Sequence, residues 1–308
     1  MTRELGAPTG PDTVPSGVRL WLLGARLRTL GAAVAPVLVG TAVALAEVDG
    51  VVGEVVWWRA ICALVVAVAL QVGVNYANDY SDGIRGTDDD RAGPLRLTAS
   101  GLVLPGAVRN AAAISFGVAA VAGLALCIVV DLRLLIVGVC AVAAAILYTG
   151  GPKPYGYSGL GEVFVLVFFG FVATAGSTYV QHREITVAAW WGSLAMGLFA
   201  CAVLLVNNIR DVPTDARMGK LTLAVRVGAQ RARIIFVLAV VGAYVSIGAI
   251  SVTFPWAVLG VVTLPLAWSP VRIVMCRTDP ASLVSALIRI ARLELLTAVA
   301  LSIGLAMS

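Results

Sequence analysis

Two polar segments of this chain place aspartates where they could hold metal ions. One reads NYANDYSDGIRGTDDD and the other NNIRDVPTDARMGK. In the first, Asp79 and Asp82 are three residues apart, and in the second, Asp211 and Asp215 are four apart. At either spacing, two side chains share one face of a helix. Paired carboxylates form a hard oxygen site that suits Mg²⁺, and the amide oxygens of Asn78 or Asn208 could complete it.

Such a site would be suited to a diphosphate. Mg²⁺ in proteins keeps several waters and is usually completed by phosphate oxygens. Two sites that face each other across a cavity would clamp a diphosphate and neutralise the charge that develops as it leaves. Each acidic segment is predicted to begin at a helix C-terminus, where the helix dipole disfavours each acid by about 0.3–1 kcal/mol. Both acid pairs therefore need an offsetting positive partner.

The helices that carry these acids belong to a membrane protein. Sixty per cent of the 308 residues are hydrophobic, 13% are charged, and the mean hydropathy is +0.95. So few charges exclude a water-soluble domain. Runs of about 20 apolar residues predict an all-α polytopic bundle of nine transmembrane helices, at 22–46, 57–80, 107–129, 132–149, 159–180, 187–209, 232–251, 254–274 and 283–307.

The basic residues predict the orientation of this bundle. Only Arg59, Arg133 and Arg183 fall on the side of the short connections; all other Lys and Arg residues fall with the N-terminus and the long loops. The positive-inside rule then places the N-terminus and the long loops in the cytosol and the C-terminus outside. Residues 1–17 are polar and rich in Pro and Gly, which predicts a disordered cytosolic tail before a single membrane domain, 18–308.

Further polar and aromatic residues on the predicted cytosolic side could bind substrate. The cationic candidates are Arg26, Arg28, Arg96, Lys153, Arg210 and Lys220, and the others are Asn75, Asn78, Asp88, Tyr148, Tyr157 and Asn208. Each basic residue could instead be a positive-inside anchor, and each tyrosine a residue of the interfacial belt. Lys153 lies in GGPKPYGYSG, whose irregular backbone must line a watery cavity or pack against other loops.

The motifs resemble those of the UbiA superfamily of intramembrane aromatic prenyltransferases. The pattern N-D-Y-x-D-x-x-x-G-x-D is matched by Asn78, Asp79, Tyr80, Asp82, Gly86 and Asp88, and YTGGPKPYGYSGLGE and NNIRDVPTDARMGKLTLAVRVG follow it. Three features together resemble most the branch that acts on 1,4-dihydroxy-2-naphthoate in menaquinone synthesis: the six-residue separation of Asp82 and Asp88, the long loop with Tyr, Lys and Tyr, and the ending T-D-x-x-x-G-K-x-T-L-A-V-R. One departure is RLRTLGAA, where that branch usually has prolines at the positions of Leu27 and Gly31.

The resemblance implies a reaction and roles for the residues. Mg²⁺ held by Asp79, Asp82, Asp211 and Asp215 would promote loss of diphosphate from a polyprenyl diphosphate, with Lys153 and Tyr148 also in the catalytic set. The naphthalene ring would then attack the allylic cation and lose carbon dioxide, giving a demethylmenaquinol. Loop 81–106 would exclude water from the cation. The expected partners are the two substrates and the lipid bilayer, and no nucleic acid.

Two other functions stay open at this point. The acceptor could be 4-hydroxybenzoate, a porphyrin-derived ring or another quinone precursor. From a different class, a metal-ion transporter would need acids near the middle of the membrane in broken helices, whereas these acids cluster at one face.

Overall fold

The computed structural model describes residues 17–47, 55–86 and 95–308, apart from the side chain of Arg28. Within these ranges the chain is all-α. The α-helices are α1 (Gly17–Ala25), α2 (Gly31–Ala46), α3 (Trp57–Ile84), α4 (Pro105–Val129), α5 (Leu134–Leu147), α6 (Gly161–Val165), α7 (Gly176–His182), α8 (Val187–Arg217), α9 (Leu223–Val227), α10 (Ala229–Thr253), α11 (Leu264–Cys276) and α12 (Pro280–Ala306). The 3₁₀ segments are η1 (Leu27–Thr29), η3 (Tyr155–Ser158) and η5 (Pro255–Thr263), and η4 (Leu166–Ala175) is a π-helix that joins α6 to α7.

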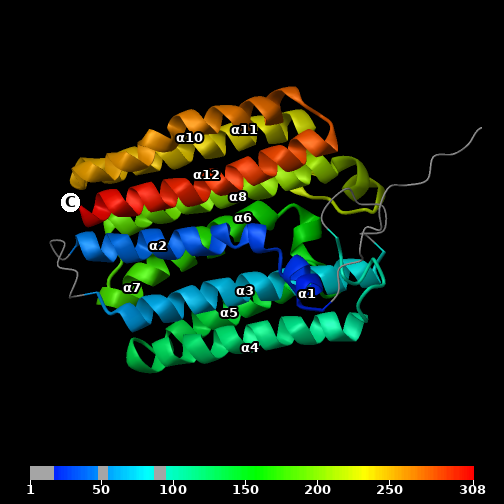
Figure 1. The fold of residues 1–308 in the computed structure, drawn as a ribbon, viewed down its shortest axis with the longest axis horizontal. Helices are drawn as coiled ribbons and strands as arrows, with labels where there is room; N and C mark the ends of the chain where they lie inside the picture. The colour runs from blue at the N-terminus through cyan, green and yellow to red at the C-terminus, as the bar shows by residue number, and fades with distance from the viewer. Residues whose placement is uncertain (1–16, 48–54, 87–94) are drawn as a thin grey trace, which may run out of the picture.

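The long helices lie side by side along one direction (Figure 1). Six described stretches are long and apolar enough to cross a membrane: Trp57–Ile84, Pro105–Val129, Gly161–His182, Val187–Arg217, Ala229–Thr253 and Pro255–Cys276. The apolar helices α2 and α5 are shorter, and α12 is not among the six. The protein is therefore a multi-pass membrane protein, and the number nine stays a prediction.

Large apolar side chains on the outside of the bundle fit a lipid surrounding. Val121, Leu238 and Val252 are 74%, 63% and 86% exposed. A water-soluble protein rarely leaves broad apolar surfaces uncovered, whereas acyl chains solvate them. Inside the bundle, Phe199 of α8 and Phe236 of α10 are fully buried in the core that α8 shares with α2, α10 and α12.

The first predicted span, 22–46, is wrong as a continuous helix. The helix breaks at Arg26, whose φ of 53° is left-handed, a conformation that costs an L-residue about 1–2 kcal/mol. The Thr29 hydroxyl donates to the Arg26 carbonyl (2.9 Å), which helps to hold the break. The membrane helix α2 begins only at Gly31. The predicted tail lies outside the described residues except for Gly17, which begins α1.

The acidic ends of α3 and α8 lie at the same end of the bundle. Both helices run in the same direction in Figure 1, and their C-terminal ends lie at its right side. The C-terminal end of α11 and the N-terminal end of α12 lie there too. The predicted common side of the two acidic segments is thus confirmed as a common end of the bundle.

Close helix contacts fix this arrangement at two glycines. At Gly40 of α2, a Cβ atom would overlap the Thr174 carbonyl oxygen of η4, and at Gly170 of η4 it would lie 2.7 Å from the Ser193 carbonyl oxygen of α8. Small residues let membrane helices approach this closely and gain van der Waals contact. The contacts hold α2 and α8 against η4.

We expect Gly40→Ala to destabilise the bundle, because the new methyl group meets backbone that cannot move aside. Overpacking of this kind costs about 1–3 kcal/mol. The measurement is the midpoint of thermal unfolding in detergent. Gly248→Ala in α10 is the control, since its Cβ has no neighbour within 4 Å. Equal midpoints for the two variants would contradict the close approach of α2 and η4.

Candidate active site

Asp79 and Asp82 lie in the last turns of α3 and are almost fully buried, 0% and 2% exposed. The two carboxylate oxygens of Asp79 accept hydrogen bonds from the backbone N–H groups of Leu97 and Thr98, each 2.8 Å long. Asp82 accepts a hydrogen bond from the Tyr157 hydroxyl, also 2.8 Å. Asp79 thus holds the turn at residues 97–100 in place, a role that its position in the motif does not reveal.

Asp211 and Asp215 lie in the last turns of α8 and are also buried. Arg210 donates two hydrogen bonds of 2.7 Å to the carboxylate of Asp211. The Nζ atom of Lys220 lies 3.9 Å from an Asp215 oxygen, and its backbone N–H donates to the Asp215 carbonyl. A cation therefore lies beside each acid of α8, as the C-terminal end of a helix dipole requires.

Tyr157 of η3 connects the two acidic helix ends. Its hydroxyl donates to Asp82, its carbonyl accepts from the Leu221 N–H (3.0 Å), and Lys220 Nζ lies 5.1 Å from the centre of its ring. Lys220 in turn faces Asp215. A continuous chain of contacts therefore runs from the end of α3 through η3 to the end of α8.

Asn75 and Arg26 belong to the junction between α1, α2 and α3. The amide of Asn75 donates to the Ala25 carbonyl (2.9 Å) and to the Thr29 hydroxyl (3.1 Å). Arg26 occupies the left-handed turn between α1 and α2. The structure thus places Asn75 as a tie that fixes this turn against α3.

The other two asparagines tie the acidic helices to the segment that follows α5. The Thr149 hydroxyl donates to the amide oxygen of Asn78 (2.8 Å). The amide nitrogen of Asn208 donates to the Glu162 carboxylate (2.9 Å). The amide oxygen of Asn78 therefore accepts a hydrogen bond from Thr149, and the contact between Asn208 and Glu162 uses the amide nitrogen of Asn208.

Lys153 and Tyr148 differ in how the structure places them. Lys153 is exposed, and no other described residue forms a hydrogen bond or ion pair with its side chain. Tyr148 packs edge-on against Tyr155 at 5.4 Å and lies over Gly161. Burial raises the pKa of Tyr155, so this phenol stays neutral. Lys220, and not Lys153, is the lysine that the structure brings to the acids.

The remaining predicted residues divide by position. Arg96 is buried next to Leu97, whose N–H binds Asp79. Asp88 lies outside the described residues, and so does the side chain of Arg28.

Arg85 also belongs to this site, although the sequence motifs do not indicate it. Its guanidinium donates to the carbonyl oxygens of Thr149 and Gly151 and lies 5.6 Å from the Tyr157 ring centre. Its place directly after α3 was a usable signal, because cations are favoured at helix C-termini. Arg85 closes the end of α3 onto the segment that carries Tyr157.

The arrangement of the acids fits Mg²⁺ whose ligands come partly from the protein and partly from a substrate. It does not fit a metal site made by protein ligands alone. Across the described ranges, no three His, Cys, Asp or Glu side chains come together as a metal site. Two separate carboxylate pairs are what Mg²⁺ needs when phosphate oxygens and waters supply the other ligands. The donor set is therefore compatible with two metal–diphosphate contacts.

Comparison with solved structures defines the class of fold. A UbiA homolog from Archaeoglobus fulgidus, solved bound to GPP and Mg²⁺, superposes with a TM-score of 0.59 over 92% of this chain and 99% of its own, at 14% identity. A structure concerned with digeranylgeranylglyceryl phosphate synthase gives 0.61 over 94% and 99%, at 13% identity. The fold is that of the UbiA-type helical bundle.

Sequence comparison gives the family. The UbiA prenyltransferase family model matches residues 33–293, and the chain belongs to this family. It is 49% identical to the 1,4-dihydroxy-2-naphthoate octaprenyltransferase of Mycobacterium tuberculosis, over 80% of this chain and 83% of that protein. It is 36% identical to the Escherichia coli enzyme of the same name, over 95% and 97%.

The link through Tyr157 predicts a selective effect on turnover. Tyr157→Phe removes the hydroxyl that holds Asp82 but keeps the ring beside Lys220. We expect kcat to fall by about 10- to 100-fold, since a hydrogen bond to a charged group contributes about 1.5–3 kcal/mol. Tyr155→Phe is the control, because its hydroxyl bonds only to the Ala144 carbonyl among the described residues and its loss should affect stability instead. Equal turnover by Tyr157→Phe and the unmodified chain would contradict the role of Tyr157.

Proposed function

We propose that this chain transfers a polyprenyl group from a polyprenyl diphosphate to 1,4-dihydroxy-2-naphthoate, with loss of carbon dioxide, and so makes a demethylmenaquinol for menaquinone biosynthesis. The observation that carries the proposal is the match along nearly the whole chain to relatives named for this acceptor. The two buried acid pairs at one end of the bundle supply the chemistry that such a transfer needs.

The acid pairs are the proposed binding site for the diphosphate. Asp79 and Asp82 would hold one Mg²⁺, and Asp211 and Asp215 another. Bound Mg²⁺ supplies positive charge to the diphosphate as its bond to the allylic carbon breaks. Lys220 and Arg210 already lie beside the acids of α8, so they can add charge to the same headgroup as it enters.

Tyr157 and Arg85 would keep the two acidic ends at a fixed separation. A catalytic electrostatic site is effective when its groups are held in place before the charge develops. The Tyr157 hydroxyl fixes Asp82, and Arg85 fixes the segment that carries Tyr157. These two residues are positioning residues in this proposal.

The acceptor reaction balances without a net proton. The ring carbon that bears the carboxylate forms the new bond to the allylic carbon, the carbon–oxygen bond of the donor breaks, and the carboxylate leaves as carbon dioxide. The electron pair of the broken donor bond leaves with the diphosphate. Because carbon dioxide is the group replaced on the ring, the aromatic system is restored without loss of a hydrogen. Water must be kept away from the allylic cation. The predicted cover, 81–106, is helical at 81–84 and at 105–106, and residues 87–94 lie outside the described residues.

The acidic end is proposed to face the cytosol. The bias of Lys and Arg towards this end supports that orientation. The proposed topology has nine spans, with the N-terminus inside and the C-terminus outside.

The acceptor is tested by product mass. Membranes that contain the chain, incubated with Mg²⁺ and a polyprenyl diphosphate, should convert 1,4-dihydroxy-2-naphthoate to a product that has gained the prenyl group and lost carbon dioxide. Membranes without the chain are the control. Turnover of 4-hydroxybenzoate with none of the naphthoate would reject the acceptor and keep the class of reaction; metal flux without any prenyl transfer would reject both.

The metal role is tested at Asp82 and Asp215, one acid from each pair. Asp82→Asn and Asp215→Asn keep the size of the side chain but lose its charge, so each should lower kcat/KM by about 100-fold or more. Removal of Mg²⁺ with a chelator should stop turnover, and added Mg²⁺ should restore it. Glu184→Gln, an exposed acid near the other end of the bundle, is the control. Full activity in a chelated sample would exclude the metal role.

A further inference from the structure

Four arginines lie on the outer surface of α11, α12 and the turn between them. They are Arg272, Arg277, Arg289 and Arg292, and all four are exposed. Within the described ranges, none of them lies within ion-pair distance of a carboxylate. Asp279 is the acid nearest in sequence, and its carboxylate caps α12 by accepting from the Ser282 N–H. The charge of Arg277 also helps to lower the pKa of Asp279, so Arg272, Arg289 and Arg292 are the three of these arginines that have no described acid beside them.

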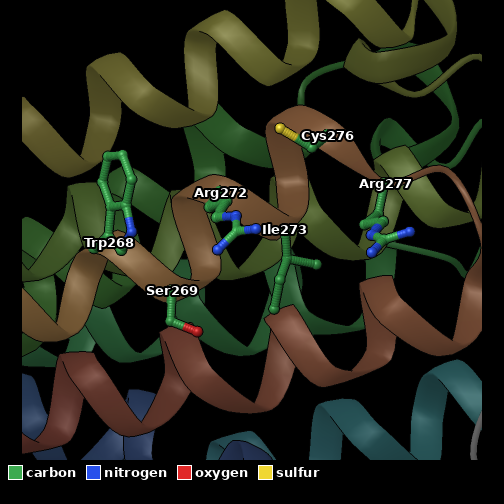
Figure 2. Close-up of a pocket in the computed structure, with 6 residues that line it drawn as sticks. All are labelled: Trp268, Ser269, Arg272, Ile273, Cys276 and Arg277. Carbon is green, nitrogen blue, oxygen red and sulfur yellow. The ribbon is translucent and has the colours of Figure 1, made fainter.

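The arginines line two adjoining hollows. One, of about 370 Å³, is lined by Trp268, Ser269, Arg272, Ile273, Cys276 and Arg277, which follow one another along α11 (Figure 2). The other, of about 470 Å³, is lined by residues of α12 that include Ile288, Arg289 and Arg292. Arg289 Nη1 donates to the Ser269 hydroxyl (2.9 Å) and so joins the two hollows. We call this surface the arginine groove.

Two of these arginines lie within α12 and not in the turn before it. Arg289 and Arg292 follow Pro280 by nine and twelve residues, about 14 and 18 Å along the helix at 1.5 Å per residue. Apolar side chains such as Val284 and Ile288 lie beside them. A charged side chain among apolar ones is costly in a membrane unless it is paired, and the long arginine side chain extends from this part of the helix towards the headgroup level.

The other charged group of this region points away from the groove. Glu294 is fully buried, whereas Arg289 and Arg292 are exposed on the outer face of α12. The buried acid cannot serve as the counter-charge of an outward-facing guanidinium. The outward-facing guanidinium groups are thus open to an anion from outside the protein.

We propose that the arginine groove binds the phosphate of an acidic glycerophospholipid from the surrounding leaflet. A lipid supplies its phosphate from the membrane side, where the groove opens between helices with exposed apolar residues such as Leu266 and Trp268. Arginine suits this ligand, because its planar fork donates two hydrogen bonds to one phosphate. The groove lies at the same end of the bundle as the acidic helix ends, so such a lipid would belong to the leaflet next to the proposed active site.

Lipid retention by the purified protein tests this proposal without any measurement of activity. The full chain is placed in nanodiscs of equal phosphatidylglycerol and phosphatidylcholine, released into the gas phase, and the lipids that stay bound are weighed by native mass spectrometry. We expect at least a five-fold preference for phosphatidylglycerol. Arg289→Gln/Arg292→Gln should reduce this preference to near unity.

Two further variants separate the groove from general charge and folding effects. Arg19→Gln/Arg109→Gln removes the same charge from α1 and α4, which Figure 1 places away from α11 and α12, and should keep the preference. Arg272→Gln should weaken the preference. The Arg272 side chain forms no hydrogen bond or ion pair with another described residue, so a folding defect would not explain the result.

Three outcomes would overturn the proposal. The first is equal retention of the two lipids by the unmodified chain. The second is an unchanged preference in both groove variants, or an equal loss in the α1 and α4 control. The third concerns farnesyl diphosphate added to the same sample. If the same arginines retain this diphosphate and not phosphatidylglycerol, the groove is a surface for the donor substrate.

Discussion

The hydrogen bond from the Tyr157 hydroxyl to Asp82 joins the two halves of the site. Asp82 ends α3 and Asp215 ends α8, and these helices are separated along the chain by four other α-helices. The Tyr157 hydroxyl donates a hydrogen bond to Asp82, and the ammonium group of Lys220 lies over the Tyr157 ring. Lys220 also forms an ion pair with Asp215. The segment that carries Tyr157 also binds Asn78 of α3 through Thr149 and Asn208 of α8 through Glu162. The proposed site would bind one diphosphate between the two helix ends, and it depends on this connection.

Burial of the four carboxylates at this site costs free energy. Four carboxylates lie almost without solvent contact at the C-terminal ends of helices, where the helix dipole disfavours them. The protein offsets part of this cost with backbone N–H groups at Asp79, with Arg210 at Asp211 and with Lys220 at Asp215. Each of these interactions stabilises one acid, and none of them joins the pair on α3 to the pair on α8. A diphosphate with Mg²⁺ would complete what the protein begins at each pair.

Charge is also distributed unevenly around this end of the bundle. The acids are buried at the ends of α3 and α8, and the arginine groove faces outward from α11 and α12. α12 carries both signs within a few residues, since Glu294 is buried and Arg289 and Arg292 are exposed. Under the two proposals, the inner surface binds the headgroup of a substrate and the outer surface binds the headgroup of a lipid. Both ligands are anionic amphiphiles that approach from the same leaflet.

The sequence by itself determined the class of protein and the chemistry of its acids. Sixty per cent apolar residues required a membrane, since so few charges cannot cover a water-soluble surface, and the spacing of Asp79 with Asp82 and of Asp211 with Asp215 indicated paired carboxylates. These properties depend on composition and on helix period, which are local. Only the tertiary structure decided which cation meets the acids. Lys153 lies in the more conspicuous motif, but Lys220 reaches Asp215 because the turn after α8 folds back against η3. It also decided that the first helix breaks at Arg26, because Asn75 of α3 holds the turn, and that Asp79 binds the backbone of residues 97 and 98. Contacts between distant segments depend on how the helices pack, which no local pattern contains.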